Sequence, residues 1–226
     1  MIEILFLDLD DTILDFHKAE RIALRKTLLS FGIDPTEHVL SRYHVINKGC
    51  WEQLEKGELT RDQVVVRRYE LLFEELGMAC DASAVTAAYT ENLAIGHYFL
   101  PGAEEAVKAL SKKYRLFLTS NGTASVQAGR MASAGLYPYF EKVFVSQEIG
   151  HNKPSIEYFE KCIAQIPNFD PKKTMIVGDS LTSDIQGGLN AGIFTCWVNP
   201  EHKDGHIKPH YEIEALSQLE ALLETL

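Results

Sequence analysis

The sequence predicts an α/β protein, with a Rossmann-like parallel sheet of about five strands, helices on both faces of the sheet, and an inserted all-helical domain. Two observations support this prediction. From residue 101 onward, short runs of branched and aromatic residues alternate with segments of helical periodicity, which is typical of βαβ units. Between residues 15 and 98, no convincing strand occurs. A helical segment therefore interrupts the sheet after its first strand.

The strands of the predicted sheet are short apolar runs. The first, Ile4–Leu7, is rich in branched and aromatic residues and is typical of a strand buried on both faces. The other strands are expected at 115–120, 142–146, 174–178 and 194–198. The helices between and after them are expected at 102–113, 123–134, 154–165, 181–191 and 213–225.

The inserted segment predicts four helices separated by turn signals. They are expected at 17–31, 37–55, 60–76 and 82–97. Gly32, Gly57 and Gly77 mark their ends, and Thr60 with Gln63 has the spacing of a capping box. We therefore expect a core domain of residues 1–14 and 100–226 and a helical cap domain of residues 15–99. Two adjacent joints would suit a cap that opens and closes over the sheet.

Composition and charge exclude several classes of function. The net charge of −10 argues against a nucleic-acid polymer or an anionic membrane as partner, because both require basic surfaces. A small anionic substrate remains possible where the site is locally positive. The four cysteines are scattered and lack zinc-site spacing, which favours reduced thiols in a cytoplasmic protein. We expect no signal peptide, because Met1 leads directly into the first strand, and no apolar run reaches membrane length.

Three carboxylates follow the first strand, in the run Asp8-Leu9-Asp10-Asp11-Thr12. The carboxyl edge of a parallel sheet is where open α/β folds bind ligands. Crowded carboxylates at a buried edge require a proton or a cation nearby. Taken alone, the run fits a turn or a helix cap equally well, with Thr12 bonding to the backbone and Asp11 facing solvent or the turn.

The second strand end carries Ser120, Asn121 and Gly122 immediately before a helix. A hydroxyl, an amide and backbone N–H groups at a helix N-terminus can cradle a phosphate. Lys153 precedes Pro154, which we expect at the first position of the following helix. From there the lysine would point toward the strand ends.

The fourth strand end carries Asp179, and Asp184 lies about one helical turn later. Capping of a helix explains one of these acidic residues well and two less well. Each motif has an ordinary structural explanation by itself. Their combination on one edge of a single sheet predicts a joint site for a metal ion and a phosphate.

The order of these motifs, Asp-x-Asp-x-Thr, Ser-Asn, Lys-Pro and Gly-Asp-x-x-x-x-Asp, resembles the haloacid dehalogenase-like hydrolase superfamily, in its members with a helical C1 cap. The stretches 178–192 and 195–200 are similar to the noncanonical pyrimidine nucleotidase branch, whose members hydrolyse nucleoside 5′-monophosphates. The resemblance implies a Mg²⁺-dependent phosphomonoester hydrolase with an aspartyl-phosphate intermediate. Its partner would be a small phosphorylated substrate, a nucleotide in the first place.

The resemblance also implies roles for individual residues. Asp8 is expected to be the nucleophile and Asp10 the general acid and base. The metal would be held by Asp8, the backbone carbonyl of Asp10, and Asp179. The phosphoryl group would be held by Ser120, Asn121, Gly122 and Lys153, with Asp184 orienting Lys153 or a metal-bound water and Thr12 supporting the turn.

Substrate choice is expected to lie in the cap. Its aromatic candidates for contact with a base or sugar are Phe16, His17, Tyr43, His44 and Trp51, of which Trp51 is preferred. Its charged candidates are Arg42, Lys48 and Arg67. Aromatic residues at helical spacing are more often part of a core, and such cations more often face solvent.

Other functions remain open at this stage. A 2-haloacid dehalogenase uses the same nucleophile on carbon, but Asp10 and Asp179 argue against it. A phosphomutase, or a phosphatase acting on sugar phosphates or phosphoglycolate, would carry the same core motifs. An inactive phospho-ligand-binding protein is a more remote alternative, because all the carboxylates and the lysine are present. The sequence leaves open whether the chain is a monomer or a homodimer.

Overall fold

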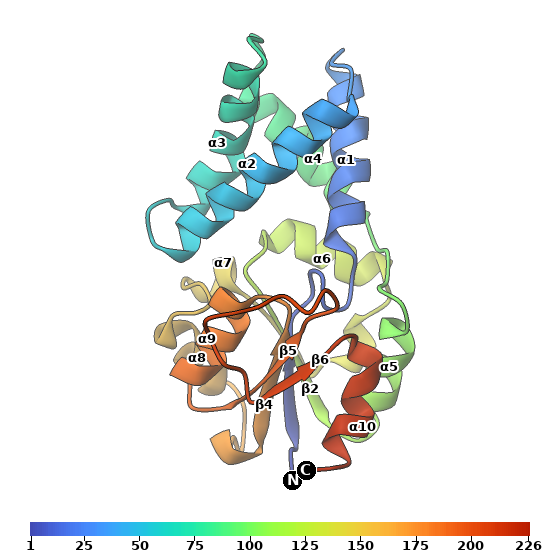
Figure 1. Ribbon diagram of the computed structural model, residues 1–226, viewed down its shortest axis with the longest axis vertical. Helices are drawn as coiled ribbons and strands as arrows, with labels where there is room; N and C mark the ends of the chain where they lie inside the picture. Colours follow the sequence, from blue (N-terminus) through green and yellow to red (C-terminus); the bar gives the residue numbers. More distant parts are fainter.

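A computed structural model describes residues 1–226 and contains a six-stranded parallel sheet with helices on both faces (Figure 1). Every neighbouring pair of strands runs parallel, in the order β3-β2-β1-β4-β5-β6. The strands are β1 (Ile4–Leu7), β2 (Arg115–Ser120), β3 (Lys142–Val145), β4 (Thr174–Gly178), β5 (Phe194–Val198) and β6 (Tyr211–Ile213). The predicted α/β fold class with a parallel sheet is confirmed.

The edge strand β6 was missed by the prediction of about five strands. It pairs with β5, where Cys196 lies opposite Tyr211 and Val198 opposite Ile213. The helix predicted from residue 213 instead begins at Leu219, after a 3₁₀ turn at Leu216–Gln218. This edge strand has three residues and one buried side chain, which is too short for an alternation of apolar and polar residues to be visible in the sequence. Only its backbone pairing with β5 identifies it as a strand.

Alternate residues of β1 face two separate apolar cores. Leu5 and Leu7 belong to a core closed by α5 (Ala103–Leu110) and α10 (Leu219–Leu223). Ile4 and Phe6 face the other side, where α8 (Ile156–Ile163) packs. Because side chains alternate along a strand, a continuous apolar run can fill both cores at once. The remaining core helices are α6 (Ala124–Ser133), the short α7 (Ser146–Ile149) and α9 (Gln186–Asn190).

The predicted start of the helix after Lys153 is wrong. Pro154 is not its first residue: α8 begins at Ile156, and Ser155 caps it by accepting a hydrogen bond from the backbone N–H of Tyr158, at 3.3 Å. A serine N-cap satisfies an otherwise free helical N–H, which proline at the first position does not do. Lys153 therefore lies on a loop before the helix.

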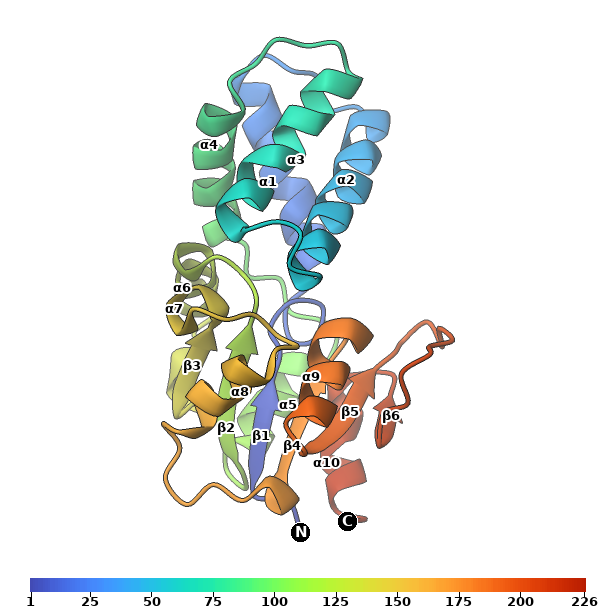
Figure 2. The same ribbon diagram turned by 90° about the vertical axis from the view of Figure 1, so that its left-hand side faces the viewer.

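Four helices follow β1 and stand above the carboxyl edge of the sheet (Figures 1 and 2). They are α1 (Phe16–Ser30), α2 (Glu37–Glu55), α3 (Arg61–Glu75) and α4 (Ala82–Ala94). Thr60 and Gln63 form the predicted capping box at the start of α3. The helices enclose an apolar core of their own, to which Val126 of α6 also contributes. The division of the chain into a cap domain and a core domain at the stated residues stays a prediction.

The strand register brings the functional motifs together. Leu7 lies opposite Leu118 of β2 and Val177 of β4, so the residues that follow these three strands meet at one edge. The backbone N–H of Asp8 continues the ladder by donating to the carbonyl of Val177, at 3.0 Å. No helix has the length and apolarity needed to span a bilayer, and all four cysteines are free thiols.

The close packing of α9 on the sheet predicts a sharp difference between two glycines. A Cβ atom at Gly188 would lie 2.4 Å from Ile176 Cγ2 and 2.6 Å from Thr195 Cγ2, whereas one at Gly49 in α2 would meet nothing within 4 Å. We expect Gly188→Ala to lower the free energy of unfolding by about 1–3 kcal/mol through overpacking. The matched variant Gly49→Ala should raise it by up to about 1 kcal/mol. Urea denaturation measures both, and an unchanged Gly188→Ala variant would contradict this packing.

Candidate active site

A cavity of about 260 Å³ lies at the carboxyl edge of the sheet and is lined by both the strand ends and the helices above them. Of the predicted site residues, all but Thr12 line it, namely Asp8, Asp10, Ser120, Asn121, Gly122, Lys153, Asp179, Asp184 and Trp51. The motifs that are separated along the sequence therefore meet around one space.

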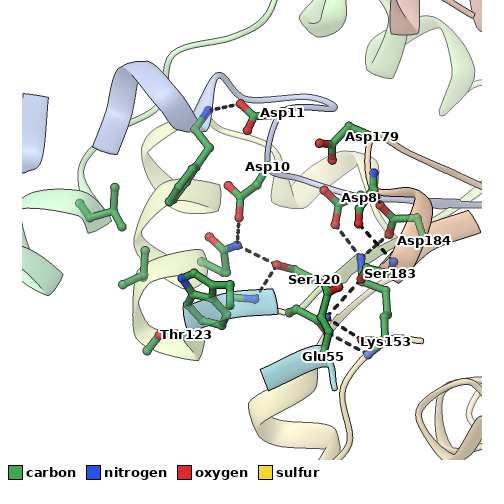
Figure 3. A pocket seen from close by; sticks show the side chains of 18 of the residues that line it. Asp8, Asp10, Asp11, Glu55, Ser120, Thr123, Lys153, Asp179, Ser183 and Asp184 are labelled. Atoms are coloured by element: carbon green, nitrogen blue, oxygen red, sulfur yellow. Dashed lines mark hydrogen bonds and ion pairs between the residues drawn. The ribbon is translucent and has the colours of Figure 1, made fainter. Parts of the chain in front are cut away.

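Lys153 is the buried cation of the site. Its side chain is almost completely enclosed, and its Nζ lies 2.6 Å from Asp8 Oδ1, 2.6 Å from Asp184 Oδ1 and 3.1 Å from the carbonyl oxygen of Thr119 (Figure 3). Asp184 reaches the lysine from a π-helical turn, Leu181–Ile185, whose start is capped by Ser180. Burial disfavours the ammonium form, but Asp184 and Asp8 outweigh that effect and raise the pKa of Lys153.

Three carboxylates cluster beside this lysine, two of which, Asp8 and Asp184, contact it. Oxygen atoms of Asp8, Asp179 and Asp184 lie within 4.8 Å of one another. Burial, reinforced by repulsion from Asp184 and Asp10, raises the pKa of Asp8 to about 8 in spite of Lys153. Burial and the neighbouring Asp8 likewise raise the pKa of Asp179 well above its usual value. The cluster therefore has more negative charge than the protein itself compensates, and a cation would relieve it.

Asp10 is held by two residues of α6 that the sequence did not single out. Gln127 Nε2 donates to Asp10 Oδ2 and to Ser120 Oγ, both at 2.7 Å. The fully buried Arg130 forms an ion pair with Asp10 and donates from Nε to the carbonyl of Gly96, at 2.9 Å. These contacts fix the Asp10 side chain. They also link it to the return segment, residues 95–102, which leads from α4 back to the sheet region. The sequence offered one signal for this pair, because Gln127 and Arg130 lie three residues apart and therefore on the same face of a helix. Polar residues at this spacing equally fit a helix face that is exposed to solvent.

The predicted phosphate cradle is itself braced. The Asn121 side chain accepts a hydrogen bond from the Lys153 backbone N–H and donates to the Lys153 carbonyl, both at 2.9 Å. Ser120 Oγ accepts from the Gly122 backbone N–H at 3.0 Å. Asn121 therefore positions the loop that carries Lys153, and a direct contact of Asn121 with a phosphate stays a prediction.

The residues after Asp10 differ in part from expectation. Thr12 Oγ1 is buried and has no hydrogen-bond partner, so its predicted bond to the backbone is absent. Asp11 does belong to the turn: it adopts φ +56°, and its Oδ1 accepts from the Phe16 backbone N–H at 2.9 Å, just before α1. Thr12 is completely buried in this turn, which sequence alone does not reveal.

Only part of the predicted cap set reaches the cavity. Trp51 and Phe16 line it, whereas Tyr43 is buried between helices. The other candidates form contacts elsewhere: His17 with Asp11, His44 with Glu20, Arg42 with Glu75, Lys48 with Glu52 and Arg67 with Glu70. Five further residues of these helices that the sequence reasoning missed also line the cavity, namely Glu55, Arg68, Tyr89, Thr90 and Leu93.

The turn between α2 and α3 contacts the strand-end loops. Arg61 donates to the Gly122 carbonyl, to Ser146 Oγ at 2.5 Å and to Asn152 Oδ1 at 2.9 Å. Glu55 accepts a hydrogen bond from Thr182 Oγ1 at 2.7 Å. Glu55, Lys153 and Ser183 line the same cavity (Figure 3). The helical segment is therefore closed onto the loops that follow the strands.

Comparison with known proteins agrees with the motifs. A family model described as haloacid dehalogenase-like hydrolase matches residues 2–192. The chain is 38% identical to pyrimidine 5′-nucleotidase PynA of Streptococcus pneumoniae, covering 95% of this chain and 92% of the relative, and 30% identical to pyrimidine 5′-nucleotidase YjjG of Escherichia coli, covering 97% and 96%. A magnesium-bound crystal structure of the HAD-hydrolase YfnB of Bacillus subtilis superposes with a TM-score of 0.94 at 39% identity, covering 99% of each chain. The chain therefore belongs to the haloacid dehalogenase-like hydrolase family.

Proposed function

We propose that this hydrolase is a Mg²⁺-dependent phosphatase that acts on pyrimidine nucleoside 5′-monophosphates through an aspartyl-phosphate intermediate. The observation that carries the proposal is the pairing of two differently held aspartates at one cavity. Asp8 shares the buried Lys153 with Asp184, while Asp10 is held separately by Gln127 and Arg130. Two full-length relatives named pyrimidine 5′-nucleotidases support the choice of substrate.

Asp8 is the proposed nucleophile. Its Oδ1 is hydrogen-bonded to Lys153, so the side chain is oriented while Oδ2 accepts no hydrogen bond. In the first step Asp8 forms a bond to phosphorus and the ester bond from phosphorus to the nucleoside oxygen breaks. Lys153 and the backbone N–H groups of the Ser120 loop offset charge on the phosphoryl oxygens.

Asp10 is the proposed proton carrier. It gives a proton to the departing 5′ oxygen and then accepts one from the water that attacks phosphorus. That attack breaks the bond between phosphorus and Asp8, releases inorganic phosphate and restores both carboxyl groups. Gln127 and Arg130 keep Asp10 in place through both steps, since they contact both of its oxygens.

The donor set fits Mg²⁺. Asp8, Asp179 and the backbone carbonyl of Asp10 offer only oxygen ligands, which Mg²⁺ prefers. Burial, and after it the repulsion between neighbouring carboxylates, raises the pKa values of Asp8 and Asp179, so a bound cation would stabilise their charged forms. When bound, the ion would supply Lewis-acid stabilisation of the phosphoryl oxygens.

The main rival is dehalogenation. A 2-haloacid dehalogenase structure from Pseudomonas syringae superposes with a TM-score of 0.67 at 26% identity over the whole chain. Displacement of a halide from carbon needs no acid for the leaving group. That reaction therefore gives no role to an Asp10 side chain held in place by Gln127 and Arg130. The position of Asp10 at the cavity therefore favours phosphorus as the reacting centre.

We further propose that residues 15–99 act as a cap over the site. The chain leaves and re-enters the sheet region at two neighbouring joints, near residues 13–17 and 96–102. The contacts of Arg61 and Glu55 with strand-end loops would hold the cap closed. Such closure would exclude water from the aspartyl-phosphate until Asp10 activates one molecule.

Phosphate release tests the proposal directly. The enzyme should release phosphate from uridine 5′-monophosphate with Mg²⁺ and lose that activity with excess chelator. Asp8→Asn should lower kcat by about 10⁴-fold or more, because it removes the nucleophile. The matched Asp11→Asn variant, which keeps the acceptor for Phe16, should stay within about threefold of wild type. Chloride release from 2-chloropropionate without phosphate release would contradict the assignment.

The raised pKa of Asp8 predicts how stability depends on pH. The folded state holds the Asp8 proton up to about pH 8, whereas the unfolded state loses it near pH 4. This contribution to stability is therefore complete below about pH 4 and is lost as pH rises through about 8. Urea denaturation of the metal-free protein should show a loss on the order of a few kcal/mol between pH 5 and 8, smaller in Asp8→Asn.

Magnesium should reverse this loss. Its binding displaces protons from Asp8 and Asp179, so Mg²⁺ should raise the melting temperature more at pH 8 than at pH 6. Differential scanning calorimetry with and without Mg²⁺ measures the two shifts. Equal shifts at both pH values, or an equal shift in Asp8→Asn, would contradict the proposed ligand set.

A further inference from the structure

Arg68 of α3 is a buried cation without an ion-pair partner. Only 4% of the residue is exposed, and no carboxylate lies within ion-pair distance of it. Its guanidinium is instead surrounded by aromatic rings, 4.8 Å from the centroid of Tyr89, 5.3 Å from Tyr69 and 5.8 Å from Tyr43. Buried arginines are usually paired with carboxylates, so this environment needs an explanation.

The orientation of Arg68 is coupled to that of Trp51 through Asn47. Asn47 Oδ1 accepts hydrogen bonds from Arg68 Nη1, at 2.9 Å, and from Trp51 Nε1, at 3.1 Å. The amide nitrogen of Asn47 donates to Glu20 Oε1 at 2.6 Å, and Glu20 Oε2 contacts His44 Nδ1 at 2.8 Å. This chain of contacts fixes an indole and a guanidinium relative to each other.

Both groups line the cavity that contains Asp8. Tyr89, whose ring packs against the guanidinium of Arg68, lines it too. The helical wall thus offers the flat apolar indole of Trp51 and the guanidinium of Arg68, which only donates hydrogen bonds. This combination suits a flat ring with carbonyl oxygens at its edge.

We propose that Trp51 and Arg68 form the subsite for the pyrimidine base, which names the recognition element of the proposed nucleotidase and rests on that function. The indole stacks on the ring, and the guanidinium donates to a ring carbonyl oxygen, O2 in every pyrimidine or O4 in uracil and thymine. The cavity of about 260 Å³ is close to the lower end of the range of ~300–1,000 Å³ that is usual for small-molecule pockets.

A purely structural role for Arg68 makes a different prediction. If Arg68 served only to fill the space between Tyr43, Tyr69 and Tyr89, its removal would destabilise the fold and affect all phosphate esters alike. A base subsite instead affects only substrates that carry the base. The ratio of kcat/KM for uridine 5′-monophosphate to kcat/KM for ribose 5-phosphate separates these roles, because both substrates share the reacting phosphate.

The adjacent arginine supplies a matched control. Arg67 is exposed and pairs with Glu70 on the surface, so Arg67→Met removes the same charge from the same helix without touching the cavity. We expect Arg68→Met to lower the kcat/KM ratio by about 10- to 100-fold, as for loss of a hydrogen bond to a charged group. Arg67→Met should leave the ratio unchanged. An unchanged ratio in a folded Arg68→Met variant would overturn the proposal.

A binding measurement covers the case in which Arg68→Met does not fold. Uridine, which carries no phosphate, should quench the tryptophan fluorescence of the wild-type protein, and Trp51→Phe should lose this quenching. Wild-type protein that binds uridine without any change in fluorescence, or a Trp51→Phe variant that keeps the quenching, would overturn the subsite. Failure of the wild type to release phosphate from any nucleotide would instead overturn the proposed function, because the uridine titration does not depend on catalysis.

Discussion

Charge balance at the carboxyl edge of the sheet determines how the site is built. Asp8, Asp179 and Asp184 lie close together in a region with little access to solvent, and the ammonium group of Lys153 pairs with two of them, Asp8 and Asp184. An uncompensated charge there would cost several kcal/mol, so the surrounding loops have to deliver the cation accurately. Asn121 does this by bonding the backbone of Lys153 on both sides. The fold thereby tolerates a strongly acidic cluster that a metal ion can complete.

The parallel sheet explains why so much of this site could be predicted. Apolar runs mark the strands, and the carboxyl ends of parallel strands share one edge whatever the details of the loops. Asp8, Lys153 and Asp184 could therefore be assigned to one site from their places after the predicted strands. Gln127 and Arg130 could not, because polar residues three apart on a helix ordinarily face solvent. Their burial depends on contacts of α6 with Asp10 and the return segment, which local sequence does not encode.

The helical segment α1–α4 shows the same limit more sharply. Arg67 and Arg68 are consecutive arginines on one helix, so residue type does not distinguish them. Successive residues of a helix are rotated by about 100°, which places Arg67 on the surface and Arg68 against the cavity. Tyr43 and Trp51 likewise share an aromatic character, but only Trp51 reaches the cavity. Periodicity identifies the inner face of each helix. It does not tell which inner residues fill the helical core and which border the space above the sheet.

A substrate that occupies both parts of the cavity would link them energetically. Its phosphate would meet Asp8 and Lys153 on the sheet, while its base would meet Trp51 and Arg68 on the helices. Arg61 already joins these two regions by contacting Ser146 and the Gly122 carbonyl beside the phosphate cradle. Binding energy from the base would then favour the closed arrangement in which Asp10 and the nucleophile are sheltered from water. A phosphate ester without a base gains no such contribution, so base recognition would act on turnover as well as on affinity.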